Sequence, residues 1–183
     1  DADAVRRVAD EGAAAAAAAG RAVRALVNVA GGFAMSGPVA ESDVALLQRQ
    51  LAINLTTAYC ATRAFLPALR AAAAAASTTN GDDGDDGDAS VVFFASAAAL
   101  PGATGVAGMS AYVAAKSGVL ALMRAVAEEE RDRGVRVNAL APTAIRTAEN
   151  LRAAGGAADE TRYVERQSVA DAVLFLCSAA ARN

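Results

Sequence analysis

Tyr112 and Lys116 are the two residues whose types and spacing point most directly to chemistry. They lie four residues apart in a stretch whose apolar residues recur at helical spacing, so both side chains are expected on one face of a helix. A free tyrosine has a pKa of about 10, and a neighbouring ammonium stabilises its phenolate form. Such a pair is able to donate and recover a proton near neutral pH. Taken alone the spacing is weak evidence, because an amphipathic helix with an ordinary surface lysine produces it too.

The composition narrows the chemistry that the other residues could perform. Histidine is absent from the 183 residues, which excludes Ser-His-Asp and Cys-His hydrolases and nearly all zinc enzymes, so we expect no metal site. The net charge is −3 and the arginines are scattered, whereas nucleic-acid binding needs a concentrated basic face. No apolar run approaches the roughly 20 residues of a membrane span. We therefore expect a small-molecule substrate, with neither nucleic acid nor a membrane as a partner.

The two cysteines, Cys60 and Cys177, lie far apart in the sequence and form no CxxC motif. This usage is typical of buried, reduced thiols in an intracellular protein, and a disulfide between them is left open. We expect a cytoplasmic location. The chain begins at Asp1 rather than Met, so import into an organelle is left open as well.

The elements that must position these residues alternate between strands and helices. Short apolar runs predict buried strands at Ala25–Val29, Val91–Ala95 and Val135–Leu140. Pro67 is expected to bend or interrupt one long helix. Strands that alternate with helices indicate an α/β fold whose parallel sheet is covered on both faces. Helices are predicted at Asp3–Ala19, Val44–Gln50, Asn54–Ala76, Ala111–Glu130, Thr147–Ala154 and Val169–Ala180.

The segment Ser77–Ser90 differs sharply in composition from the rest of the chain. It is rich in Gly and Asp and has no apolar residue before Ala89, which predicts a disordered surface loop inserted in the domain. A calcium-binding loop is the alternative. A count that begins at Asp82 puts Gly84 where the second ligand belongs and Phe93 where a bidentate glutamate belongs, so the solvated loop is favoured.

The surroundings of Tyr112 resemble the classical short-chain dehydrogenase/reductase family at five places, in that family's order. Together the five motifs are specific, and the resemblance covers nearly the whole chain outside Ser77–Ser90. The matching segments are Asn28-Val29-Ala30-Gly31 after a strand, Asn54-Leu55 at the start of a long helix, Ser96 at a strand end, Tyr112 to Gly118, and Val135 to Asn138 followed by Pro142 and Thr147.

The resemblance implies a Rossmann-like, doubly wound parallel sheet that is incomplete in this chain. The family's first three strands and its glycine-rich turn would precede Asp1, and its last strand would follow Asn183. Residues 1–183 would then form one partial Rossmann domain, with three core strands and an exposed sheet edge at the first of them. No GxxxGxG pattern occurs before Asn28, so this piece alone is expected to bind cofactor poorly.

The resemblance also implies a function and a set of roles. The chain would transfer hydride between NAD or NADP and a carbonyl, alcohol or pterin substrate, in a protein that forms homo-oligomers. Tyr112 would be the general acid or base, Lys116 would stabilise its phenolate and bind the nicotinamide ribose, and Ser96 would polarise the substrate oxygen. Asn54 would hold a water, its alternative being a helix N-cap. The residues expected to bind the cofactor are Asn28, Ala30, Gly31, Tyr112, Lys116, Pro142, Ile145 and Thr147.

Some positions depart from the family pattern. The sixteen residues from Ser96 to Tyr112 are a few more than is usual, so either the loop is longer or the equivalent position is Ala99 and no serine is used. Dihydropteridine-reductase-like members lack that serine, and the chain resembles them at three places. These are Val29 to Phe33, Gly105 to Tyr112 and Thr147 to Asn150.

Two other functions compete with an oxidoreductase. A truncated, non-catalytic remnant or pseudoenzyme would keep the fold and act only in association with related chains. An extended sugar-nucleotide epimerase shares the YxxxK pair, but it needs a sizeable substrate domain after the last motif, where only Ala148–Asn183 remain. The oxidoreductase is therefore the favoured hypothesis.

Overall fold

A three-stranded parallel sheet forms the centre of the computed structural model, which describes residues 1–78, 89–153 and 163–182. The strands are β1 (Ala25–Asn28), β2 (Ala89–Phe94) and β3 (Val135–Leu140), in the order β1-β2-β3. The central strand β2 is buried along almost its whole length, because helices cover both faces of the sheet. This explains its continuous apolar run and confirms the predicted α/β fold with a parallel sheet.

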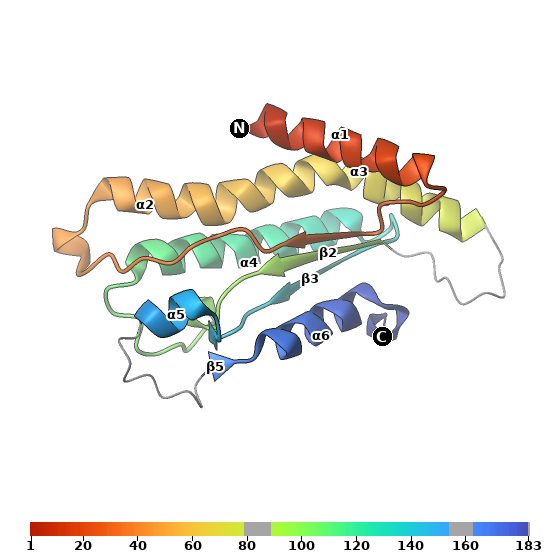
Figure 1. Ribbon diagram of the computed structural model, residues 1–183. Helices are drawn as coiled ribbons and strands as arrows, with labels where there is room; N and C mark the ends of the chain where they lie inside the picture. The colour runs from red at the N-terminus through yellow and green to blue at the C-terminus, as the bar shows by residue number, and fades with distance from the viewer. Residues whose placement is uncertain (79–88, 154–162, 183) are drawn as a thin grey trace.

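The helices form layers on the two faces of this sheet (Figure 1). On one face lie α3 (Thr57–Thr78) and α4 (Ser110–Glu130), and on the other lies α6 (Arg166–Cys177). The N-terminal helix α1 (Ala2–Ala18) packs on α3. The core lies between the sheet and the α3/α4 layer, with Leu69 and Phe93 fully buried at its centre.

A π-helical turn departs from the predicted helix pattern. Helix α2 (Val44–Gln50) continues through this turn (Leu51–Thr56) directly into α3, so Asn54 lies inside a helical run and does not open one. The N-cap alternative for Asn54 is therefore wrong. Pro67 does not interrupt α3. The backbone hydrogen bond that it removes is offset by the burial of Leu66 and Leu69 on the same helix.

Several predicted boundaries move by a few residues. Helix α3 extends through Thr78 and β2 begins at Ala89, so both ends of the predicted loop belong to regular elements. Residues 79–88, and with them the calcium-loop alternative, lie outside the described residues. Four elements were not separately predicted or begin elsewhere. They are β4 (Ala144–Ile145) paired in parallel with β5 (Tyr163–Val164), α5 (Ala148–Ala153), and α6, which begins three residues before the predicted Val169.

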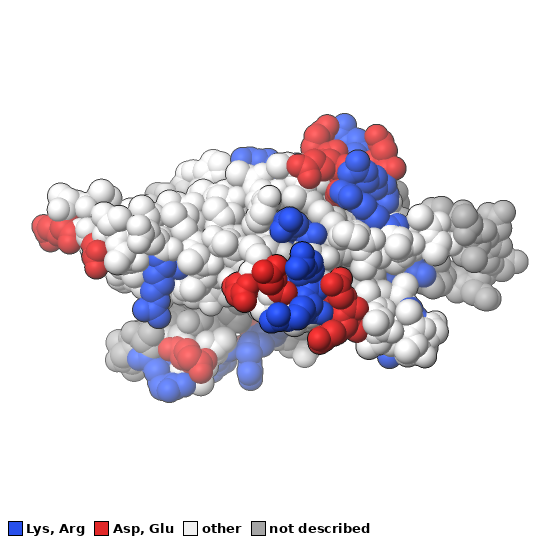
Figure 2. Space-filling model, turned by 90° about the horizontal axis from the view of Figure 1, so that it is seen from above, with Lys and Arg blue, Asp and Glu red and all other residues white. Residues whose placement is uncertain are grey.

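Charged side chains on the face that carries α1 and α3 gather in mixed groups of both signs (Figure 2). Arg6 pairs with Asp3 at 3.1 Å, and Arg131 pairs with Glu128. Within the described parts of the chain, no helix is both long and apolar enough to cross a membrane. Both cysteines, Cys60 on α3 and Cys177 on α6, are free and half-buried.

One buried ion pair joins α3 to α4. The carboxylate of Glu130 is fully buried, and it accepts a hydrogen bond of 2.8 Å from Arg70 Nε and a second from Arg70 Nη2. The hydrogen bonds from Arg70 hold the pKa of Glu130 below its ordinary value of 4.5, and the charge of Arg133 adds to this effect. The pair therefore links α3 to the carboxyl-terminal end of α4, the helix that contains Tyr112 and Lys116.

Replacing Glu130 with glutamine should lower the free energy of unfolding by about 2 kcal/mol, because the buried carboxylate loses its charge-assisted hydrogen bonds from Arg70 while the Arg70 side chain, 39% exposed, regains water. Since the pKa of Glu130 is lowered in the folded chain, its contribution is complete above pH 4.5 and is lost as the pH falls through the lowered value. Urea unfolding at a series of pH values measures both effects. Glu128→Gln, which breaks an exposed pair on the same helix, is the matched control and should change stability little. Equal losses in the two variants would contradict the assignment.

Candidate active site

A cleft of about 830 Å³ lies at the carboxyl-terminal edge of the sheet. Its walls come from residues 29 and 31–33 after β1, residues 94–98 at the end of β2, and residues 142–145 after β3. The backbone N–H of Ala97 donates to the carbonyl of Pro142 at 2.9 Å, which joins two of these loops. Parallel strands end at a common edge, where α/β proteins usually bind their ligands.

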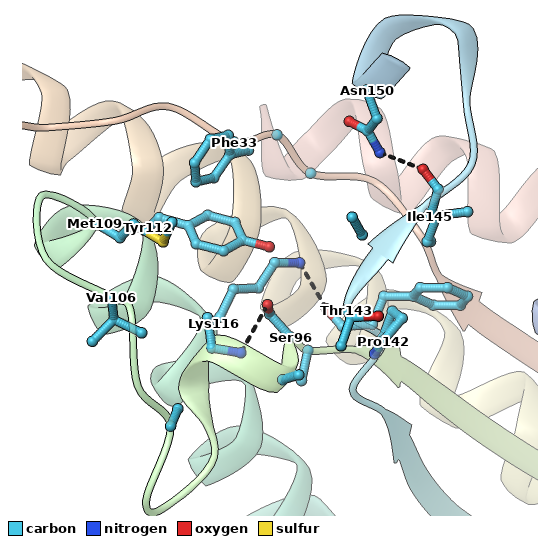
Figure 3. Close-up of a pocket in the computed structure, with 18 of the residues that line it drawn as sticks. Phe33, Ser96, Val106, Met109, Tyr112, Lys116, Pro142, Thr143, Ile145 and Asn150 are labelled. Carbon is cyan, nitrogen blue, oxygen red and sulfur yellow. Dashed lines mark hydrogen bonds between the residues drawn. The ribbon is translucent and has the colours of Figure 1, made fainter. Parts of the chain in front are cut away.

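Tyr112 and Lys116 both line this cleft from α4. The Lys116 Nζ atom lies 6.0 Å from the centre of the Tyr112 ring. In Figure 3 the Tyr112 hydroxyl, the Lys116 amine and the Ser96 hydroxyl all face the same space. A phenol hydroxyl and an amine from α4 and a serine hydroxyl from the end of β2 therefore face one cleft.

Lys116 is held in place by the end of the central strand. Its side chain is almost fully buried, with 6% of the residue exposed, and Nζ donates a hydrogen bond of 2.7 Å to the carbonyl oxygen of Phe94. Burial lowers the pKa of Lys116 from its ordinary value of 10.5, because removal from water disfavours the charged amine. Lys116 is also the only lysine in the chain, among seventeen basic residues.

Asn54 fastens the loop after β1 to the helix layer. Its side-chain amide donates to the carbonyl of Gly32 at 2.9 Å and accepts from the backbone N–H of Gly32 at 3.1 Å. The same amide donates to Gln50 within the π-helical turn. Next to it, a Cβ on Gly31 would lie 2.5 Å from Asn54 Oδ1 and 3.4 Å from Lys116 Nζ. Only a glycine therefore fits between this amide and the lysine.

Ser96 lines the cleft together with Ala97 and Ala98, whereas Ala99 does not. Ser96 lies two residues beyond β2, is buried, and lines the cleft. Its Oγ accepts a hydrogen bond of 3.3 Å from the N–H of Ala98, at the start of the 3-10 turn Ala97–Ala99. This geometry favours the alternative in which Ser96 is the family's serine and the loop between Ser96 and Tyr112 is longer than usual. It does not favour Ala99 as the equivalent position.

Three residues predicted to bind the cofactor do not line this cleft. The Asn28 side chain turns into the protein and donates to Thr62 Oγ1 at 3.1 Å, so it joins β1 to α3. Ala30 is exposed beside the cleft. Thr147 Oγ1 accepts from the N–H of Asn150 at 3.2 Å and so caps α5. Pro142 and Ile145, by contrast, do line the cleft.

The structure adds wall residues that sequence reasoning missed. The ring of Phe33 meets that of Tyr112 edge to face, with 5.0 Å between centroids and an angle of 87° between planes. Met109, Asn150 and Tyr163 also line the cleft, and Asn150 Nδ2 donates to the carbonyl of Ile145 at 2.7 Å (Figure 3). These residues lie in loops or at element ends, where no periodicity indicates a side chain's direction.

The family model described as short chain dehydrogenase matches residues 2–154. The chain belongs to this family. Among curated short-chain dehydrogenases, it is 31% identical over 155 residues to trans-4-hydroxycyclohexanecarboxylate dehydrogenase of Sinomonas cyclohexanicum, covering 84% of the chain and 52% of that protein. It is 32% identical over 189 residues to inactive 2-(S)-hydroxypropyl-CoM dehydrogenase 2 of Xanthobacter autotrophicus, covering 93% and 74%. The chain thus spans about half the length of the Sinomonas relative.

Solved structures of the same family share the fold. A short-chain type dehydrogenase/reductase from Mycobacterium ulcerans superposes with a TM-score of 0.78 at 25% identity, over 99% of this chain and 62% of that one. A structure from Escherichia coli CFT073 complexed with NADPH has a TM-score of 0.75 at 22% identity, over 100% and 66%. These likenesses confirm the Rossmann-like α/β fold.

Replacing Gly31 with alanine should lower the free energy of unfolding by about 2 kcal/mol, since the new methyl group meets the immobilised Asn54 amide. Gly12→Ala is the matched control. Gly12 lies inside α1 with its nearest neighbour 4.0 Å from a built Cβ, so alanine there should stabilise the helix by about 1 kcal/mol. Urea unfolding of both variants checks the pair. If the Gly31→Ala variant were as stable as the wild type, the loop after β1 would not be tightly held by Asn54.

The single lysine permits a direct test of its burial. Isotope-labelled lysine should give one side-chain NMR signal, with a titration midpoint below 10.5. Between the lowered pKa and 10.5, the unfolded chain binds more protons than the folded chain, so the stability of the wild type should rise with pH over that window. Lys116→Met should lack this rise. A midpoint at or above 10.5 would contradict the buried position of the amine.

Proposed function

We propose that this chain carries the catalytic centre of an NAD(P)-dependent oxidoreductase that interconverts a carbonyl and an alcohol. The observation that supports this most strongly is the convergence of the Tyr112 hydroxyl, the Lys116 amine and the Ser96 hydroxyl on one cleft. Each group has a distinct chemical capacity: proton donor, cation and hydrogen-bond donor. Membership of a dehydrogenase family is consistent with it.

The residues of the cleft suit the nicotinamide end of such a cofactor. The cleft volume of about 830 Å³ lies in the usual range for small-molecule sites. Gly31 lets a ligand approach the backbone beside Lys116. An ammonium has three N–H donors and one is given to Phe94, which leaves donors for ribose hydroxyls. Pro142 and Ile145 form the facing wall.

In the direction of reduction, Tyr112 acts as the general acid. A bound nicotinamide cofactor would supply the hydride that reduces the carbonyl carbon. The electron pair of the carbonyl π bond goes to oxygen, which takes the proton of the Tyr112 hydroxyl. Ser96 Oγ donates a hydrogen bond to that oxygen while charge develops on it. In oxidation the same phenol, as phenolate, removes the proton.

Lys116 and Asn54 support this proton transfer. The charged form of the Lys116 amine lies beside the Tyr112 ring and stabilises the phenolate left after the proton has moved. Asn54 positions the loop around Gly32, and its Oδ1 retains a lone pair for the water that we expect it to hold. Asn28 and Thr147, which contact Thr62 and Asn150, contribute indirectly by holding the strand end and α5.

Several finer assignments belong to the same proposal. The cofactor is NAD or NADP, and the substrate is a small carbonyl compound or alcohol, with a pterin as the alternative that the dihydropteridine-reductase-like motifs suggest. Residues 1–183 would act as one partial domain of a cytoplasmic homo-oligomer.

A non-catalytic role is the second candidate, and one observation favours it. The relative from Xanthobacter autotrophicus, whose match covers 93% of this chain, is named as inactive. Titration with reduced nicotinamide cofactor separates the two functions. Binding in the micromolar range supports the enzyme, and no binding supports the pseudoenzyme.

Tyr112→Phe should reduce hydride transfer by about a hundredfold or more, because the general acid is lost, while cofactor binding is retained. The assay follows the consumption of reduced nicotinamide with a panel of ketones. Tyr59→Phe is the matched control, since Tyr59 is an exposed tyrosine on α3 that does not line the cleft. Its activity should equal that of the wild type. Unchanged activity in Tyr112→Phe would remove this residue from the mechanism.

A further inference from the structure

One side of the cleft is an apolar wall. It consists mainly of Phe33, Ala103, Val106 and Met109, to which Thr104 adds one hydroxyl group, and all of these residues line the cleft. In the view of Figure 3, Phe33, Val106 and Met109 lie on one side of the Tyr112 hydroxyl, while Pro142, Thr143 and Ile145 lie on the other. If the second side receives the nicotinamide, the apolar wall is where the carbon skeleton of the substrate lies.

Hydrogen bonds hold this wall in place. The backbone N–H of Ser36 donates to the carbonyl of Gly108 at 2.7 Å. Ser36 Oγ donates to the same carbonyl at 3.0 Å and lies 3.1 Å from Ser110 Oγ. The segment that carries Phe33 is thus joined to the loop that carries Met109, at the start of the helix that bears Tyr112. Phe33 also contacts the Tyr112 ring, so it is an ordered part of the wall although 55% of the residue is exposed.

The described residues that line the cleft carry little charge. Among the described residues that line it, Lys116 is the one charged side chain, and its amine lies at the base of the cleft against Phe94. A substrate carboxylate beside the apolar wall would lose water and gain no cation there, which is unfavourable. The Sinomonas relative is named for a carboxylate substrate, so a similar substrate would lack a charged partner among these residues.

We propose that the substrate is an uncharged ketone or secondary alcohol with an apolar skeleton, and that Phe33 determines this specificity by packing against that skeleton. The proposal rests on the oxidoreductase function argued above. For a cyclic ketone the reaction would consume one reduced nicotinamide and one proton. The carbonyl carbon receives the hydride, and the oxygen receives the proton from Tyr112, which is replaced from solvent.

A matched pair of ketones tests the substrate class. Cyclohexanone and 4-oxocyclohexanecarboxylate share the ring and the carbonyl, and differ in one carboxylate. With NADH or NADPH at a concentration shown to saturate it, the purified chain should reduce cyclohexanone with a kcat/KM at least about tenfold higher than that for 4-oxocyclohexanecarboxylate. Phe33→Ala should lower kcat/KM for cyclohexanone by about tenfold and leave cofactor binding unchanged. Phe175→Ala is the control, because Phe175 on α6 is equally exposed, at 53%, and does not line the cleft.

Ligand binding is measured separately from turnover by saturation-transfer NMR of each ketone in the presence of the same saturating cofactor. Binding of cyclohexanone that Phe33→Ala abolishes and Phe175→Ala preserves supports the proposal, even where no turnover is seen, and absent turnover would then count against the oxidoreductase function alone. Equal or stronger binding of the carboxylate, binding of neither ketone, or binding that Phe33→Ala does not change would overturn the assignment of substrate class.

Discussion

The hydrogen bond between Lys116 Nζ and the carbonyl oxygen of Phe94 joins α4, the helix that carries Tyr112, to the last residue of the central strand. An amine with 6% of its residue exposed has lost nearly all of its water, so a backbone acceptor must replace it. The strand end therefore decides where Lys116 lies. Because Tyr112 is one helical turn earlier on the same face, the strand end also decides where its hydroxyl points.

Close packing against the π-helical turn fixes the position of α4. A Cβ on Gly118 would come within 2.8 Å of Leu55 in the π-helical turn, so α4 and that turn already touch. The turn also carries Asn54, whose amide bonds both backbone groups of Gly32. A π turn accommodates one more residue than an α turn, so the face that precedes it is rotated relative to the face that follows. This lets Asn54 face the loop after β1 while Leu69 of α3 still faces the sheet.

Features set by periodicity or by a continuous apolar run could be predicted from the sequence. The central strand was predicted because a strand covered on both faces needs apolar residues at successive positions, as Val91, Val92 and Phe93 show. The position of Asn54 could not be predicted, since no residue pattern marks a π turn. Asn28 was identified from its motif as a cofactor-binding residue, but the direction of its side chain depends on Thr62, which is distant in sequence. Phe33 follows two glycines in a loop, where no repeat indicates that its ring meets Tyr112.

The choice of lysine at position 116 also follows from the geometry. Sixteen of the seventeen basic residues of this chain are arginines, and a guanidinium stays charged at any pH that proteins tolerate. An arginine here would bring a larger planar group against Gly31, where a single added Cβ would already lie 3.4 Å from the amine. It would also keep its full charge after burial, whereas burial lowers the pKa of the lysine. A compact amine therefore fits this position better than a guanidinium, because it donates to the Phe94 carbonyl and occupies less of the space beside Gly31.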